Sequence, residues 1–271
     1  MQHSDFTGLI LLFAAGKRPT RGALKDFTFA QHAVSLTHDP SDENGLHLVE
    51  PGAEPVAPDQ AAQVSSDLDN GVWVELLREG LTFDLIGLAP GPAWDFPVVQ
   101  HRFDLEALPT AFRTEALQLA PGQHLAGGGR SMPIVKGLIA LARDLTHHFH
   151  DLEAVVWPPS QSAIGRRFFE SISTAWLEGG AFPALGLTAF KETMDGALQS
   201  EGLEFWIGQE LRIEQPISSD KVAATRLGVR LVNQLILVGG LEESERIVSP
   251  DGTRLVMRPS RNRKFIRVWR E

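Results

Sequence analysis

The alternation of helical repeats with strand-length apolar runs after residue 130 constrains the fold more than any other feature. Residues 132–149 carry apolar side chains at the three- and four-residue spacing of an amphipathic helix. The run LEAVVW (152–157) that follows has the length and composition of a buried strand. Near the end, ERIV-SPDG-TRLVM places a turn between two apolar runs and predicts a β-hairpin. This mixture predicts an α+β fold in which helices pack on a mixed or antiparallel sheet.

Capping and turn residues predict the other elements of the second half. Ser162 is a good N-cap, so we expect a helix from there to about Leu177, where two glycines end it. The segments 183–190 and 203–214 are predicted to be strands. The sequence SSDK opens a long helix that runs to Val238, and KFIRVW is a last strand.

The first half gives a less regular pattern. Residues 8–15 predict a strand that is buried on both faces, and residues 22–34 predict a helix. The runs VWVELLREG and LTFDLIGLA predict a hairpin that turns at residues 78–80. We expect a helix within 104–117 and a strand from Leu117 to His124.

The order of these elements suggests a division near residue 115. Residues 1–115 would form an N-terminal α+β half with a long acidic loop at 38–71, which is rich in proline, glycine and acids. Residues 116–271 would form a C-terminal α+β half. We expect the two halves to be related α/β sandwiches.

The composition excludes several kinds of chemistry. The chain has 271 residues and no cysteine, which rules out disulfides, thiol nucleophiles and cysteine-ligated metals. It has no tyrosine, so no phenol acts as an acid or an oxyanion donor. The apolar run LILLFAA (9–15) is too short to span a bilayer and lacks a basic flank. We therefore expect a cytoplasmic bacterial protein without a membrane partner.

The charged residues are unevenly distributed. The net charge is −9, and Arg78 is the only Lys or Arg between Asp26 and His101. Seven basic residues follow from position 254, against one acid: Arg254, Arg258, Arg261, Arg263, Lys264, Arg267 and Arg270. Such a tail contacts phosphates in some proteins; in others it protects an edge strand from pairing or meets an acidic half of the same chain. We favour the second explanation, because the field of the whole chain repels nucleic acid.

The sequence GGGRSMP (127–133) is a candidate anion site. Gly128, Gly129, Arg130 and Ser131 stand before a predicted helix, where free N–H groups and the guanidinium could hold an anion or a nucleotide phosphate. The sequence also approaches the nucleophile elbow of serine hydrolases, with proline in place of the last glycine. The alternative is a flexible turn with Ser131 as N-cap.

The sequence THHFHD (146–151) is a candidate metal site. At about 100° per residue, the three histidines spread around the helix end, while Phe149 faces the core. His147, His150 and Asp151 could lean the same way and bind a metal with a ligand from another segment. The alternative is that histidines at a helix C-terminus stabilise its negative dipole end.

Six tryptophans are distributed along the chain, and most are expected in the core. Trp94 lies in a Pro-Gly loop, where we expect it to be exposed to a partner.

Three segments together resemble one family. They are LTFDLIGLAPGPAWDFP, HDLEAVVWPPSQSAI and GLEFWIGQELRIE, and they lie within about residues 80–240. In this order they are similar to an uncharacterised bacterial domain-of-unknown-function family of cytoplasmic α+β proteins. In this resemblance His124 corresponds to a histidine before the first long helix. The resemblance implies a family without an assigned enzyme activity.

The sequence predicts a binding protein rather than an enzyme. No convergent catalytic set stands out, no cofactor is expected, and the opposite charges of the two ends would steer a partner. The expected partner is another protein, in a stress, secretion or toxin–immunity setting. The alternatives are a hydrolase or metal-dependent enzyme that uses Ser131 or the set His147, His150 and Asp151, and a small-anion or nucleotide site at the GGGRS turn.

Overall fold

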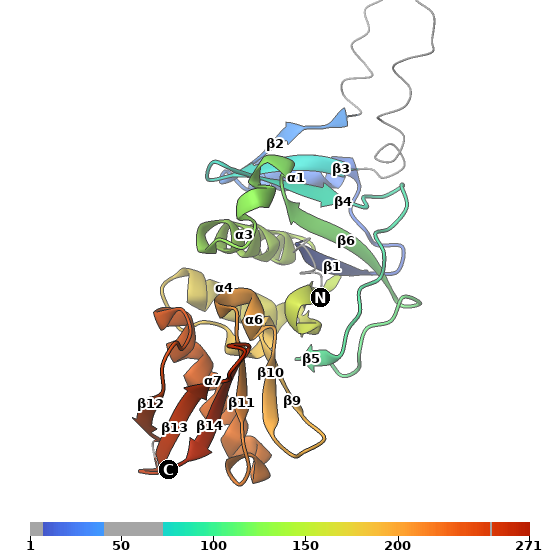
Figure 1. Ribbon diagram of the computed structural model, residues 1–271. Coiled ribbons are helices and arrows are strands. Elements are labelled where there is room, and N and C mark those ends of the chain that lie inside the picture. Colours follow the sequence, from blue (N-terminus) through green and yellow to red (C-terminus); the bar gives the residue numbers. More distant parts are fainter. Residues whose placement is uncertain (1–7, 41–72, 250) are drawn as a thin grey trace, which may run out of the picture. The chain divides into compact units, whose positions relative to one another are not determined.

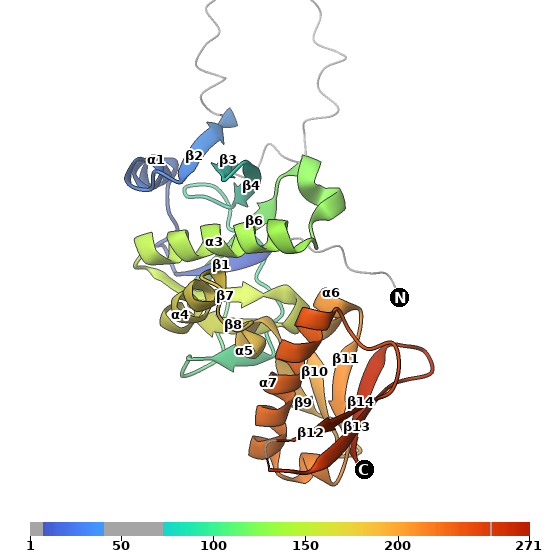
Figure 2. The same ribbon diagram turned by 90° about the vertical axis from the view of Figure 1, so that its left-hand side faces the viewer.

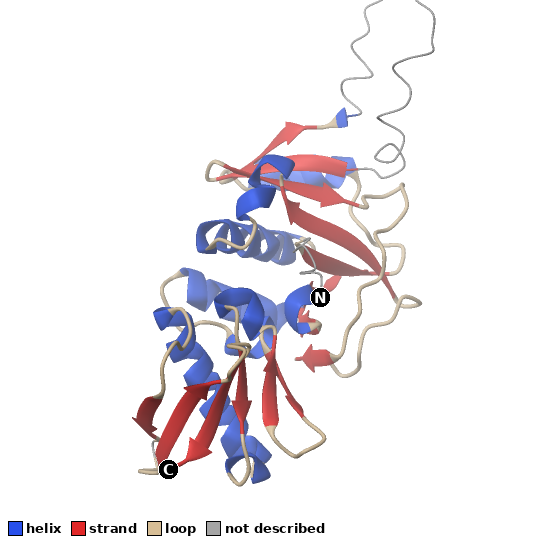
Figure 3. Cartoon of the chain, viewed as in Figure 1, coloured by secondary structure: helices blue, strands red, loops and turns tan. Residues whose placement is uncertain are grey.

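The chain forms two compact units that both contain helices and strands (Figures 1 and 3). The computed structural model describes residues 8–40, 73–249 and 251–271. The first unit comprises Met1–Pro97 and Pro109–Val155, and the second comprises Val98–Leu108 and Val156–Glu271. The described strands form two mixed sheets, one of eight strands and one of six. The predicted α+β class is therefore confirmed.

The first unit begins with a strand and a helix and returns repeatedly to one sheet. Its elements are β1 (Leu9–Ala14), α1 (Arg21–Ala30), β2 (Val34–His38), β3 (Trp73–Arg78), β4 (Leu81–Ile86), β6 (Thr114–Pro121), the 3-10 helix η1 (Gln123–Gly128), α3 (Met132–His148) and the first part, to Val155, of β7 (Leu152–Trp157). Its strands lie in the order β2-β3-β4-β6-β1-β7.

The centre of this sheet confirms two sequence predictions. β1 is almost entirely buried and pairs antiparallel with β6, with Leu9 opposite Leu119. β3 and β4 form the predicted hairpin, whose two turn residues Glu79 and Gly80 both have positive φ. Turns with this backbone suit the right-handed twist of the two strands that they join.

Helix α3 covers one face of this sheet and confirms the predicted helix at 132–149. Its apolar stripe, which includes Leu138 and Leu145, is fully buried, and the helix contacts β1, β4 and β6. Asp144 is also buried on this side. It is held by the Arg78 guanidinium, whose Nε lies 3.1 Å from its carboxylate, so a charged pair crosses from helix to sheet.

Other predictions for this region were wrong. The helix expected at 22–34 ends at Ala30, and Val34 already starts β2. The helix expected within 104–117 is absent from this described segment. A strand starts at Thr114 instead, because its backbone pairs with β1 on one side and β4 on the other. The acidic loop predicted at 38–71 lies almost entirely outside the described residues.

The second unit contains short helices, one long helix and the six-stranded sheet. Its elements are β5 (His101–Phe103), the 3-10 helix η2 (Pro158–Ser160), β8 (Ser162–Gly165), α4 (Arg166–Leu177), α5 (Ala184–Leu187), β9 (Ala189–Glu192), β10 (Leu198–Glu201), α6 (Leu203–Ile207), β11 (Glu210–Ile213), the 3-10 helix η3 (Ile217–Ser219), α7 (Lys221–Val238), β12 (Glu245–Val248), β13 (Arg254–Pro259) and β14 (Phe265–Arg270).

The six-stranded sheet has the order β12-β13-β14-β11-β10-β9. Only β11 and β14 pair in parallel, while the other neighbours are antiparallel. Helix α7 lies along one face of this sheet (Figure 2). A Cβ atom at Gly228 of α7 would lie 2.7 Å from the Phe190 ring and 3.5 Å from Ile213, so the lack of a side chain allows this close contact.

An aromatic cluster forms the core beside the short helix α6. Trp157 is fully buried, and its ring stacks on Trp206 with centroids 5.4 Å apart. Trp176, Phe182 and Phe205 pack edge-on against Trp206 at 4.9–6.0 Å. Rings arranged this way fill space with favourable quadrupole geometry. Trp206 and Trp176 were expected in the core, and they belong to this cluster.

The second half confirms the long helix and the hairpin but corrects three assignments. Asp220 caps α7 through the N–H groups of Val222 and Ala223, and β12 pairs with β13 as predicted. Ser162, however, belongs to strand β8, and α4 begins only after Gly165. The segment 203–214 begins with the short helix α6 instead of a strand, and in 183–190 the strand begins only at Ala189.

None of the helices in the described part of the chain is both long enough and apolar enough to cross a membrane.

Two glycines that flank α6 provide a matched test of this local fold. Gly202 has φ +87°, and an added Cβ would lie 2.7 Å from Ser160 Cβ, whereas Gly208 has φ +74° with open space around it. We expect Gly208→Ala to cost about 1 kcal/mol, from backbone strain alone. Gly202→Ala should cost about 1–3 kcal/mol more, because Ser160 must also move. Urea denaturation measures both, and equal losses would contradict this account.

Candidate functional site

The candidate site is the face of the six-stranded sheet that lies opposite α7, called the outer face below. Side chains alternate between the two faces of a strand. In β11 and β14 the buried residues, such as Leu211 and Ile266, lie on the α7 side. The residues between them, such as Arg212 and Arg267, are partly exposed and therefore lie on the outer face.

A row of cationic side chains crosses the outer face at one level. Lys191 lies opposite Gln199, Gln199 opposite Arg212, Arg212 beside Arg267, and Arg267 opposite Arg258. Residues paired in this way project from the same face of a sheet. With strands about 4.8 Å apart, the row spans roughly 19 Å. We call these five residues the cationic row.

One buried acid fixes the middle of the cationic row. Glu214 Oε1 accepts hydrogen bonds from Arg212 Nε at 3.0 Å and from Arg267 Nε at 2.5 Å. The Glu214 side chain is 10% exposed, while that of Arg267 is 43% exposed. The carboxylate therefore lies beneath a guanidinium that reaches the surface. Arg212 also pairs with Asp195, which is more exposed than its partner.

Two aromatic rings accompany the cationic row along β14. Phe265 and Trp269 stand two residues before and two residues after Arg267, so all three side chains project from the outer face. The Arg267 guanidinium lies 5.0 Å from the centre of the Trp269 ring, a cation–π contact. Both rings are partly exposed. The central strand of this face thus presents a ring, a cation and a second ring.

Further cations lie on the β13–β14 hairpin. Arg254 and Arg258 belong to β13, and Arg261, Arg263 and Lys264 belong to the connecting turn. All five are exposed, and within the described residues no ion pair is recorded for any of them. The basic tail of the sequence is therefore gathered on one hairpin, where Arg258 is opposite Arg267 and Val256 is opposite Trp269.

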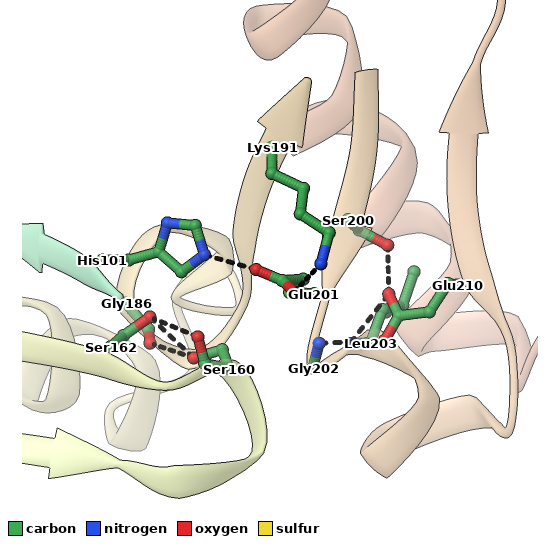
Figure 4. A network of polar contacts seen from close by, with 10 residues as sticks. All are labelled: His101, Ser160, Ser162, Gly186, Lys191, Ser200, Glu201, Gly202, Leu203 and Glu210. Atoms are coloured by element: carbon green, nitrogen blue, oxygen red, sulfur yellow. Dashed lines mark hydrogen bonds and ion pairs between the residues drawn. The ribbon is translucent and has the colours of Figure 1, made fainter. Parts of the chain in front are cut away.

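A polar network borders the outer face where β9 and β10 meet (Figure 4). Glu201 lies between His101 and Lys191: its carboxylate is 2.5 Å from His101 Nε2 and also accepts a hydrogen bond from Lys191. Burial favours the neutral acid, but hydrogen bonds from Lys191 and His101 outweigh burial and lower the pKa of Glu201. Glu201 is therefore held as an anion.

Glu210 occupies a different environment in the same network. Its carboxylate accepts hydrogen bonds from the Ser200 hydroxyl and from the backbone N–H groups of Gly202, Leu203 and Glu204, at the start of α6 (Figure 4). Burial raises the pKa of Glu210 to about 7, and these four hydrogen bonds oppose that rise. This side chain satisfies the first turn of α6 and joins it to the sheet.

The network does not assemble a hydrolytic triad among the described residues. Ser160 Oγ and Ser162 Oγ are 2.7 Å apart and fully buried, and Ser160 also donates to the Gly186 carbonyl. Among the described residues, His101 is hydrogen-bonded to Glu201 and to neither hydroxyl. The network therefore orients the strand ends.

The GGGRS turn lies between η1 and α3. Gly129 is buried, while Gly128, Arg130 and Ser131 are exposed. Ser131 is the N-cap residue of α3, but its side chain makes no capping hydrogen bond. The anion site predicted here and the use of Ser131 as a nucleophile stay predictions.

The THHFHD sequence forms the end of α3, as helical geometry predicts. Phe149 packs its ring against Phe13 and Phe27, each with centroids 6.0 Å apart. His147, His150 and Asp151 are exposed. A metal at these three would need a ligand from another segment, and the described residues form no group of three or more His, Cys, Asp or Glu that could hold an ion.

Trp94 was predicted as an exposed partner contact. The residue is 37% exposed, and its backbone forms an isolated bridge to Ala116 of β6. Its role at a partner surface stays a prediction.

Sequence reasoning found the basic tail but missed the rest of the cationic row. Lys191, Gln199 and Arg212 lie more than 40 residues before Arg258 in the chain, and only strand pairing brings them to one level. The available signal was the alternation of polar and apolar residues in LRI and FIRVW, which predicts a half-exposed strand. That signal does not tell which strands are neighbours.

No family model matches this sequence, and no curated protein or solved structure matches it. The resemblance to an uncharacterised bacterial family therefore stays a prediction.

The raised pKa of Glu210 predicts a pH-dependent stability. The folded protein keeps the Glu210 proton up to about pH 7, whereas the unfolded chain releases it near pH 4.5, the ordinary pKa of this side chain. The folded state thus binds more protons than the unfolded chain between about pH 4.5 and pH 7. As the pH rises through this range, Glu210 should lower the free energy of unfolding by about 3 kcal/mol. Glu210→Gln should remove this component of the slope, measured by urea denaturation at several pH values.

The control for this prediction is Glu204→Gln. It removes the same charge from an exposed position in α6. Its slope should equal that of the parent, and an equal flattening in both variants would contradict the assignment to Glu210.

Proposed function

We propose that this protein acts by binding a negatively charged macromolecule, and that the outer face of its six-stranded sheet is the binding surface. The cationic row is the observation that carries this proposal. Five side chains from five strands lie at one level, and four of them are Lys or Arg. A cationic surface of this kind attracts a negatively charged macromolecule.

The depth of the charges supports this proposal. In the pairs Lys191–Glu201 and Arg267–Glu214, the base is 43% exposed in each case, and the acids are 19% and 10% exposed. In these two pairs the acid lies deeper, so a partner at the surface meets the cation first. The pair Arg212–Asp195 is the reverse, because its acid is 65% exposed and its base 17%. Arg258 adds an exposed guanidinium for which no ion pair is recorded among the described residues.

The distribution of charge between the units also supports it. The sequence of the first unit contains 9 Lys and Arg against 18 Asp and Glu, and that of the second contains 16 against 16. The net charge of −9 therefore belongs entirely to the first unit. The sequence favours a protein partner over nucleic acid because the whole chain is negatively charged. The second unit has no net charge of its own, so this argument does not apply to it.

The enzymatic alternatives lack a comparable arrangement among the described residues. Ser131 and His147 lie at opposite ends of α3, and the described residues form no group of three or more His, Cys, Asp or Glu that could hold a metal. We therefore propose a binding role, in a stress, secretion or toxin–immunity setting, rather than the activity of a hydrolase or a metal-dependent enzyme.

Charge reversal on the outer face tests the proposal. Arg258→Glu should weaken binding to immobilised heparin, a generic polyanion, by roughly five- to tenfold near 0.1 M salt, because it removes one cation and adds an anion. The matched control is Arg226→Glu, which makes the same change at an exposed position of α7, away from the outer face. The measurement is the salt concentration at which each protein elutes.

The two variants separate the outer face from net charge alone. If Arg226→Glu weakens heparin binding as much as Arg258→Glu, the outer face is not the binding surface. If the parent protein binds neither heparin nor any other polyanion, the proposed function is wrong.

A further inference from the structure

We infer that the macromolecule bound by the outer face is a single-stranded nucleic acid, whose bases stack on Phe265 and Trp269 while its phosphates meet the arginines of β13. This inference rests on the proposed function and narrows its partner to one chemical class.

The first step is the position of the two rings. Phe265 and Trp269 are four residues apart on β14 and project from the same face, so they stand roughly 13 Å apart along the strand. Both are partly exposed although large apolar side chains favour burial. Any nucleic-acid base has a flat π face that stacks on such a ring, so this contact does not depend on base identity.

The second step is the guanidinium between the rings. Arg267 lies 5.0 Å from the Trp269 ring and is held from below by Glu214. A planar guanidinium that is fixed in place also stacks on bases. β14 therefore offers three successive stacking groups from Phe265 to Trp269.

The third step is a line of cations parallel to the rings. Arg254 and Arg258 lie on the outer face of β13, the neighbouring strand, where Arg258 is opposite Arg267. Both are exposed, and no ion pair is recorded for either within the described residues. A sugar-phosphate backbone that runs along β13 places its bases over β14, so the two strands supply phosphate and base contacts together.

The fourth step separates this partner from other polyanions. In a duplex, the faces of the bases are already stacked, so the rings of β14 would have nothing to stack on. An acidic peptide would use the arginines but would gain little from two rings with a cation between them. The combination of rings and cations therefore favours single strands.

The test compares three fluorescein-labelled polyanions by anisotropy. They are oligodeoxythymidine of about 12 nucleotides, a duplex of the same length and a polyglutamate peptide of similar charge. We expect the full-length protein to bind the single strand at least tenfold more tightly than the other two. Trp269→Leu and Phe265→Leu should each weaken single-strand binding roughly tenfold and leave polyglutamate binding unchanged.

Arg258→Gln tests whether Arg258 contacts a phosphate of the bound strand. It should reduce the magnitude of the slope of log K against log salt by about 0.7 for the single strand, the value for one lost phosphate contact. Arg226→Gln on α7 is its matched control and should leave the slope unchanged. Thermal unfolding of every variant shows whether the protein is folded. If Trp269→Leu does not fold, Phe265→Leu alone tests the contribution of the rings.

The outcomes separate the two proposals. If polyglutamate or duplex binds as tightly as the single strand, or if neither ring variant changes single-strand binding, this inference is overturned and the proposed function stands. If heparin and all three probes fail to bind, both are overturned.

Discussion

The packing of α7 on one face of the six-stranded sheet determines what the second unit presents to solvent. Gly228 lets the helix approach Phe190 and Ile213 closely, and the buried residues of β11, β13 and β14 face the same side. Strand side chains alternate, so burying one set commits the other set to the opposite face. That opposite face carries arginines, a lysine and two aromatic rings, and the candidate site follows directly from this one-sided packing.

Ion pairs hold the basic side chains of the outer face in fixed positions. Long basic side chains lose considerable rotamer entropy when they are fixed, and an isolated surface pair contributes little to stability. Glu214 is largely buried and shared by Arg212 and Arg267, so one carboxylate positions two guanidiniums on neighbouring strands. Where β10 ends and β11 begins, Glu210 satisfies the first N–H groups of α6, and Glu201 holds His101 and Lys191. These acids arrange the cations and strand ends around the site.

Sequence reasoning succeeded where periodicity was long and failed where elements were short. The spacing in 132–149 and the Asp220 cap predicted α3 and α7, because many residues repeat the same pattern. The segment 203–214 was predicted as one strand, since LEFWI is apolar enough for either structure. In the fold it forms one helical turn, bounded by Gly202 and Gly208 at positive φ and joined to the Glu210 carboxylate. Those contacts depend on the neighbouring strands, so the local pattern could not reveal them.

The sequence by itself determined the α+β class, the absence of cysteine chemistry, the long helices and the basic end of the chain. It also predicted that histidines at the end of α3 spread around the helix, since that follows from 100° per residue. The tertiary structure decided the order of the strands, and with it the cationic row. Lys191, Arg212 and Arg258 lie far apart in the chain, and a strand's own side chains do not specify its neighbour. Only backbone pairing and one-sided burial place these cations at one level beside Phe265 and Trp269.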